Sequence, residues 1–236
     1  MKKLIYKASE RGFADHGWLK AAHFFSFAGY YDPSKMHFGM LRVLNDDKVG
    51  PGAGFGMHPH DNMEIVTIPT HGALEHKDTM GNSTVIKTSD VQIMSAGTGV
   101  RHSEFNPSKE ESVNLFQIWV FPKVKNIQPR YEQKTFNATE RINRWQLIVS
   151  PDSSEGAVWI NQDAWFFLAD PEKGSELIYE TKKTGNGSFL LVIEGRIEVE
   201  GVELGARDAI GIYDVDKFSL SALDDSKVLL IDIPMN

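Results

Sequence analysis

The chain contains no cysteine among its 236 residues. This absence excludes disulfide bridges, thiolate metal sites and thiol nucleophiles together, and it is compatible with a reducing compartment. Long apolar runs are missing as well, since no stretch approaches the roughly eighteen residues that a membrane-spanning helix needs. The sequence therefore predicts a globular protein that does not contact the membrane and does not use sulfur chemistry.

An excess of positive charge is also missing. The formal net charge is −7 and the sequence pI is about 5.6, which argues against the broad basic face of proteins that bind nucleic acid. The first residues are basic like those of a secretory signal, but Lys7 and Glu10 interrupt the segment before an apolar region forms. We therefore expect no direct contact with nucleic acid and a cytoplasmic location.

Two common catalytic motifs do not occur. The glycine-rich segment 50–56 has no Gly-x-Gly-x-x-Gly frame and no Gly-Lys-Ser/Thr ending, so it is better interpreted as a loop leading into a strand than as a nucleotide loop. A Gly-x-Ser-x-Gly elbow, which marks many serine hydrolases, is absent too. Nucleophilic catalysis therefore has no candidate residue.

What the chain does contain is a series of short strand-like runs. Helical periodicity is scarce, whereas β-branched and aromatic residues recur in runs closed by Gly, Pro, Asn or Asp. These runs cover residues 64–68, 91–94, 115–121, 147–149, 189–193, 196–199 and 228–233. Such spacing predicts an all-β fold, either a sandwich or a barrel.

The middle of the chain predicts a division into two domains. Residues 150–156 form a turn-rich break, and the polar segment 129–144 before it has the composition of a crossing between halves. We expect an N-terminal metal-binding domain over 1–135 and a C-terminal domain without metal ligands over 136–236.

A weak internal repeat supports two copies of one fold, because the segment that follows Gly72 resembles the segment that follows Gly195. An ungapped alignment places Thr181 and Lys183 at the positions of His58 and His60, and Leu220 and Ala222 at those of His102 and Glu104. All eight histidines lie at or before position 102. The second copy is therefore predicted to be a supporting wall.

The candidate ligands form two pairs with the same spacing. His58 and His60 are two residues apart, and so are His102 and Glu104. Residues i and i+2 of a strand point to one face, so each pair can direct both side chains at a single point. Three nitrogens and one oxygen suit a redox-capable divalent metal better than a structural zinc, which favours thiolates.

These pairs lie within two longer patterns that resemble the cupin motifs. The residues that fit are Gly52, His58, His60 and Glu64 for the first motif, and Gly97, Gly99, His102 and Asn106 for the second. Gly97 stands where the motif has proline. Further segments resemble the pirin family over nearly the whole chain, namely residues 24–27, 30–33, 54–60, 92–97 and 102–104.

The resemblance implies two jelly-roll-like cupin barrels that face each other, with one divalent transition metal held by the residues that match His58, His60, His102 and Glu104. Iron is the first expectation, with manganese, nickel, cobalt, copper or zinc as alternatives. Glu64 is not counted among the ligands in that family. Bacterial members are associated with quercetin 2,3-dioxygenase activity, whereas the animal pirin is described as an iron-dependent transcriptional co-regulator.

Two functions of different classes follow from this resemblance. The first is a metal-dependent dioxygenase that cleaves quercetin-type flavonols with O₂, in which Glu104 is both a ligand and the general base. The second is an iron-binding, redox-responsive regulator whose protein partner the sequence does not identify. A cupin with other small-molecule chemistry, such as an isomerase, is a third possibility, because one barrel architecture hosts many activities. We expect a monomer.

The remaining histidines and aromatic residues have simpler interpretations. His16, His23, His37 and His71 are predicted to be hydrogen-bonded surface or core residues. His76 either orients a ligand by a hydrogen bond or lies in a loop. Most of the apolar residues near the motifs are predicted to be packing residues rather than substrate contacts; these are Phe24, Phe25, Phe27, Phe38, Phe55, Met57 and Met94.

Overall fold

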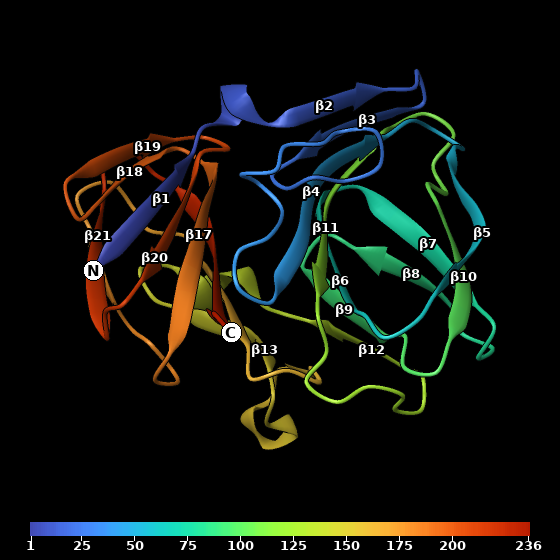
Figure 1. Ribbon diagram of the computed structural model, residues 1–236. Coiled ribbons are helices and arrows are strands. Elements are labelled where there is room, and N and C mark those ends of the chain that lie inside the picture. Colours follow the sequence, from blue (N-terminus) through green and yellow to red (C-terminus); the bar gives the residue numbers. More distant parts are fainter.

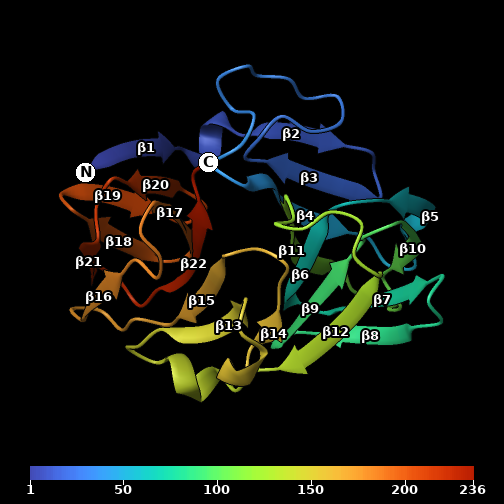
Figure 2. The ribbon, with the colours of Figure 1, turned by 60° about the horizontal axis from the view of Figure 1, so that its bottom comes forward.

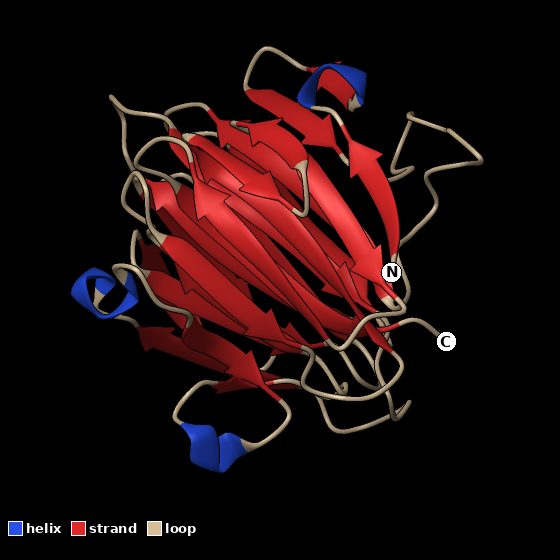
Figure 3. Cartoon of the chain, turned by 90° about the vertical axis from the view of Figure 1, so that its left-hand side faces the viewer, coloured by secondary structure: helices blue, strands red, loops and turns tan.

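The computed structural model describes residues 1–236 and consists almost wholly of strands. The chain forms two halves that lie side by side, and each half contains one seven-stranded and one four-stranded sheet (Figure 1). Figure 3 shows the strands stacked in layers, with the few helical turns at the periphery. The chain forms no helix that is long and apolar enough to span a membrane. The predicted all-β class with two barrels is confirmed.

The N-terminal barrel is built from strands that precede residue 136. Its larger sheet has the order β12-β9-β6-β11-β4-β3-β2, and its smaller sheet has the order β5-β10-β7-β8. The bounds are β2 Gly12–Asp15, β3 Leu19–His23, β4 Leu41–Val49, β5 Gly54–His60, β6 Glu64–His71, β7 Ala73–Asp78, β8 Ser83–Lys87, β9 Asp90–Ser95, β10 Val100–Phe105, β11 Val113–Val120 and β12 Arg130–Thr135.

The C-terminal barrel has the corresponding sheets β1-β20-β17-β22-β15-β13-β14 and β16-β21-β18-β19. The bounds are β1 Lys2–Tyr6, β13 Gln146–Ser150, β14 Val158–Trp159, β15 Trp165–Ala169, β16 Glu176–Glu180, β17 Asn186–Glu194, β18 Arg196–Val199, β19 Val202–Gly205, β20 Ala209–Tyr213, β21 Lys217–Ala222 and β22 Lys227–Pro234. Three short 3₁₀ turns complete the chain: η1 Ala8–Glu10, η2 Ala138–Arg141 and η3 Ser153–Glu155. The strand-like runs found in the sequence fall in strands, except that Phe121 lies one residue beyond the end of β11.

The first strand of the chain belongs to the sheet of the second half. β1 pairs with β20 in an antiparallel register, with Leu4 opposite Gly211 (Figure 2). The chain then crosses to β2 in the other barrel. The domain boundary between residues 135 and 136 stays a prediction. β1 precedes this boundary in the sequence but lies in the C-terminal barrel.

The largest part of the core joins the two halves. A cluster of 28 buried apolar residues includes Leu44, Val66 and Phe116 from the first half and Phe189 and Ile231 from the second. These side chains come from the larger sheets, so the two barrels pack with these sheets facing each other. Burial of this size stabilises the arrangement through the hydrophobic effect.

The two halves repeat one topology, since the order β9-β6-β11-β4 corresponds to β20-β17-β22-β15 and β5-β10-β7 to β16-β21-β18. In the hairpins that follow Gly72 and Gly195, Leu74 pairs with Ile86 as Ile197 pairs with Leu204, so His76 corresponds to Val199. Glu104 pairs with His76 and Leu220 pairs with Val199, so Leu220 corresponds to Glu104 rather than to His102. The sequence alignment is therefore wrong at both ligand pairs, because the turns before β17 and β21 differ in length from the turns before β6 and β10.

The same register identifies the equivalents of the other three expected ligands. His102 lies two residues before Glu104 on β10, so it corresponds to Phe218, and Tyr179, which pairs with Phe218, corresponds to His58. His60 then corresponds to Thr181. The C-terminal barrel has no histidine or carboxylate at any of these four positions.

Candidate metal centre and substrate cavity

Three histidines converge between β5 and β10. His58 and His60 point to one face of β5, and His102 lies on the adjacent strand, directly opposite His58. Ring nitrogens of all three lie within 4.8 Å of one another, and the Nε2 atoms of His60 and His102 are 3.0 Å apart. The i, i+2 spacing therefore brings three of the four expected ligands together.

The fourth, Glu104, lies in a second group that shares His102. Its carboxylate lies within 4.8 Å of ring nitrogens of His76 and His102. The register between β5 and β10 shifts between His102 and Glu104, because Gly56 and Met57 of β5 lie opposite Ser103 alone; the bulge is in β5, and β10 pairs with β7 without a shift. Gln117 Nε2 donates to both carboxylate oxygens, at 3.0 and 3.2 Å, and Gln117 Oε1 accepts from Thr67 Oγ1 at 3.2 Å. Glu104 is thus held in place by the larger sheet.

The protonation of these groups suits a metal. Burial, followed by the neighbouring His58, lowers the pKa of His60 to about 4, and burial with the other histidines lowers that of His102 to about 2. Burial raises the pKa of Glu104 to about 7, and the bond from Gln117 opposes this rise. The uncharged rings of His60 and His102, close to a third histidine and a carboxylate, are a donor set that fits a divalent transition metal.

A hydrogen-bonded chain lies behind His102. Its Nδ1 is 3.4 Å from His76 Nδ1, and His76 Nε2 is 3.1 Å from Asp78 Oδ2. Asp78 is itself fixed by donors from Met80 and Asn82. If His102 offers Nε2 as a ligand, its Nδ1–H donates to His76, and His76 Nε2–H donates to Asp78. His76 is therefore a buried strand residue and not a loop residue.

Glu64 lies away from the histidines, although it fits the cupin motif. Val66 and Ile68, which share its face of β6, belong to the core between the barrels. Glu64 Oε2 accepts from Ser95 Oγ at 2.7 Å and from the backbone N of Asn161 in the other half at 3.2 Å. This carboxylate helps to join the two halves, and its omission from the expected ligand set agrees with this position.

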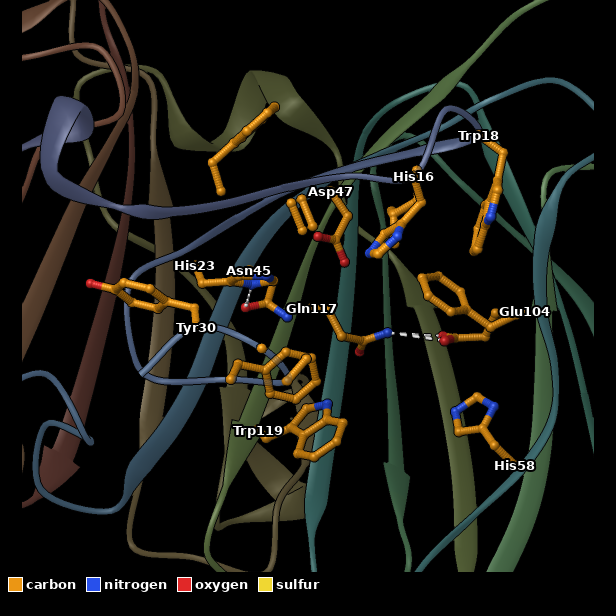
Figure 4. A pocket seen from close by; sticks show the side chains of 18 of the residues that line it. His16, Trp18, His23, Tyr30, Asn45, Asp47, His58, Glu104, Gln117 and Trp119 are labelled. Atoms are coloured by element: carbon orange, nitrogen blue, oxygen red, sulfur yellow. Dashed lines mark hydrogen bonds between the residues drawn. The ribbon is translucent and has the colours of Figure 1, made fainter. Parts of the chain in front are cut away.

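The histidines open onto a cavity of about 910 Å³ between the two sheets of the N-terminal barrel. Figure 4 shows Glu104 and His58 on one wall and Gln117, Asn45 and Asp47 directed inward from the opposite side. Aromatic rings line much of the remainder; they belong to Phe13, Trp18, Phe27, Tyr30, Phe55 and Trp119. A cavity of this size and lining suits a flat aromatic molecule.

The structure separates the aromatic and methionine candidates into three groups. Phe24, Phe25, Phe38 and Met94 are buried in the core, as predicted for most of the set, and Met57 is exposed. Phe27 and Phe55 line the cavity. The cavity is also lined by Trp18, Tyr30 and Trp119, which the sequence does not identify, because alternation alone does not show which strand faces border an open space.

The four remaining histidines lie in different environments. His23 is buried and its Nδ1 donates to Asn45 Oδ1 at 2.8 Å, as expected for a hydrogen-bonded core residue, yet it also lines the cavity together with His16. His37 Nδ1 lies 2.9 Å from the carbonyl oxygen of Gly39, and His71 is exposed.

Asp47 is the one carboxyl group of the cavity besides Glu104. It is 6% exposed, and its Oδ1 atom is buried without a hydrogen-bond partner. Burial, followed by the charges of Asp46 and Glu104, raises the pKa of Asp47 to about 8. This carboxyl group is therefore largely uncharged at neutral pH in the protein without bound metal.

The molecule is a bicupin, in which two barrels of one topology share a chain and only the N-terminal barrel holds a group of histidines. The family model for pirin matches residues 6–120, and that for the quercetinase C-terminal cupin domain matches residues 147–233. The chain belongs to the pirin family.

Individual relatives match over nearly the whole chain. It is 44% identical to the quercetin 2,3-dioxygenase of Escherichia coli K12, covering 98% of this chain and 99% of that one. A pirin-like protein of Caulobacter vibrioides is 42% identical, with coverage of 94% and 95%. The crystal structure of the bacterial pirin YhhW from E. coli in complex with nickel(II) has a TM-score of 0.93 and 42% identity, with 99% of each chain covered.

Proposed function

We propose that the protein is a metal-dependent dioxygenase that opens the central ring of quercetin-type flavonols with O₂ and releases carbon monoxide. The observation that carries this proposal is a group of three histidines, His58, His60 and His102, that shares His102 with a second group containing the buried Glu104, beside a cavity of about 910 Å³ with aromatic walls. The name of the E. coli relative, quercetin 2,3-dioxygenase, supports the same substrate class.

The proposed metal ligands are His58, His60, His102 and Glu104. Iron remains our first expectation, and the nickel(II) complex of the E. coli pirin makes nickel the first alternative to test. When bound, a divalent transition metal supplies Lewis acidity to a substrate oxygen and a site for dioxygen. The location of the protein in the cytoplasm and its monomeric state stay predictions.

The residues of the chain have separate tasks in this scheme. The aromatic rings of Phe55 and Trp119 hold the planar substrate with its 3-hydroxyl group toward Glu104. Glu104 accepts the proton of that hydroxyl group, and Gln117 keeps the carboxylate in position with two hydrogen bonds. Removal of this proton makes the adjacent carbon electron-rich, which is what reaction with dioxygen requires.

The test is the loss of quercetin's visible absorbance in air by protein reloaded separately with iron, nickel, manganese, cobalt, copper or zinc. We expect metal-dependent loss, and we expect Glu104→Gln to lower the rate by at least about a hundredfold, the lower end of the usual effect of a general base. Metal content of the variant, measured in parallel, separates loss of the base from loss of the metal.

Two results would count against the proposal. Full activity of Glu104→Gln would refute the role of Glu104 as base. No loss of quercetin with any metal, at confirmed stoichiometric loading, would refute the dioxygenase and favour the alternative of an iron-binding, redox-responsive regulator.

A further inference from the structure

The wall of the cavity opposite the histidines carries polar groups that the proposed reaction does not use. Asn45 and Asp47 are two residues apart on β4, so both side chains point into the barrel (Figure 4). Asn45 Oδ1 accepts from His23, which leaves its Nδ2 group toward the cavity. The Oδ1 atom of Asp47 has no partner at all.

A lack of basic residues near β4 does not explain why Asp47 has no hydrogen-bond partner. Asp46, on the other face of β4, pairs with Arg11 at 3.0 Å and with Arg207 at 3.3 Å. Cations are therefore available next to this strand, but only on its far side. A buried carboxyl group without a partner costs stability, and such groups are retained mainly at functional sites.

The equivalent positions of the C-terminal barrel show whether the fold itself requires polar side chains on this wall. Leu115 pairs with Asp47 and Gln117 with Asn45, as Val228 pairs with Ala169 and Leu230 with Phe167. Asp47 and Asn45 thus correspond to Ala169 and Phe167, and Gln117 corresponds to Leu230. The barrel without histidines needs none of these polar groups, so the sheet itself does not require them.

We propose that Asp47 is a specificity-determining residue, whose carboxyl group hydrogen-bonds a phenolic hydroxyl group of the substrate at the end remote from the histidines, with the amide of Asn45 beside it. The inference rests on the proposed function and narrows the substrate class to flat aromatics that carry a ring hydroxyl group besides the reacting one. An uncharged carboxyl group both donates and accepts, which suits a neutral phenol better than a cation.

The test compares two flavonols that share the reacting group. Quercetin carries ring hydroxyl groups, and 3-hydroxyflavone has none besides the 3-hydroxyl. Nickel-loaded wild type, Asp47→Ala, Asp47→Asn and the exposed control Asp216→Ala are titrated with each compound without oxygen, with quenching of Trp18 and Trp119 fluorescence as the readout, since both rings line the cavity.

We expect Asp47→Ala to raise the Kd of quercetin about tenfold, the effect of one lost hydrogen bond, and to change that of 3-hydroxyflavone less than about twofold. Asp47→Asn, which keeps an acceptor and a donor, stays within about threefold of wild type, as does Asp216→Ala. In air the KM follows the Kd and kcat changes less than about twofold, because the contact is the same in the ground and transition states.

Equal effects of Asp47→Ala on both flavonols, or no effect on either, would overturn the inference. So would failure of the wild type to bind quercetin, or a fall in Tm of Asp47→Ala large enough to give the residue a structural role. Selective binding of quercetin that depends on Asp47, without turnover by any metal form, would support the role of Asp47 in substrate specificity and refute the dioxygenase activity.

Discussion

The two barrels have the same strand order but fill their interiors differently. The C-terminal barrel encloses a cluster of fifteen buried apolar residues, whereas the N-terminal barrel contains clusters of seven and four and a cavity of about 910 Å³. Phe218 and Tyr179 pack where His102 and His58 converge. The comparison teaches that a few substitutions on the inner faces of the same strands exchange a packed core for a binding site.

Each barrel also contains a buried aspartate, and the two aspartates differ in their hydrogen bonds. Asp232 accepts hydrogen bonds from Tyr179 Oη at 2.6 Å, from the backbone N of Lys182 at 2.7 Å and from Asn186 Nδ2 at 2.6 Å. Asp47 has an oxygen with no partner. The first aspartate is part of a structural network, and the second lines the cavity without such a network.

We expect the largest effect, on metal affinity, when a ligand of the N-terminal barrel is replaced by the side chain found at the equivalent position of the C-terminal barrel. His102→Phe removes a ligand and inserts the residue found at the equivalent position 218, so metal affinity should fall by more than about a hundredfold, beyond the usual effect of losing a residue that only orients a ligand. Metal content after dialysis is the measurement. The control Phe218→Ala should keep its metal and lose about 3–5 kcal/mol of stability. Stoichiometric metal in His102→Phe would contradict the ligand assignment.

We expect smaller effects on stability, opposite in sign, when the buried aspartate of each barrel is replaced by asparagine. Asp232→Asn should lower the free energy of unfolding by about 1.5–3 kcal/mol, because an amide donor then faces donors. Asp47→Asn should raise the Tm of the metal-free protein by about 2–4 °C for each kcal/mol gained. Thermal melts of both variants measure these shifts.

The gain from Asp47→Asn depends on pH. The folded-state pKa of Asp47 is raised to about 8, so between about pH 4 and pH 8 the folded protein keeps a proton that the unfolded chain has lost. Wild-type stability from this group therefore falls as pH rises through that window, and the variant escapes the fall. The gain should be larger at pH 7.5 than at pH 5, and a lower Tm of Asp47→Asn at both would contradict it. Other titratable groups line the same cavity: His16, His23, His58, His60 and Glu104.

The smallest effect concerns His76 and Asp78, which lie behind His102; His76 corresponds to the apolar Val199 of the C-terminal barrel. Asp78→Asn and His76→Gln should each weaken metal binding by about tenfold, because the orientation and tautomer of His102 are no longer fixed. Competition with a chelator measures this affinity, and the exposed His71→Gln is the matched control. Unchanged affinity in both variants would exclude a positioning role.

The sequence by itself determined the class of fold and the half of the chain that carries the site. Short apolar runs with turn residues between them predict strands, because their period is local. The i, i+2 spacing of His58 with His60 and of His102 with Glu104 fixes a shared strand face for each pair. The absence of histidine beyond position 102 assigned the candidate centre to the N-terminal half.

Only the tertiary structure decided which strand faces border the cavity and which partners meet across it. The pairing of β1 with β20, the position of Glu64 between the barrels and the chain from His102 through His76 to Asp78 all depend on contacts between distant segments. Alternation along a strand tells which residues share a face. It does not tell whether that face meets the other barrel, a filled core or a cavity, because this depends on the packing of whole sheets.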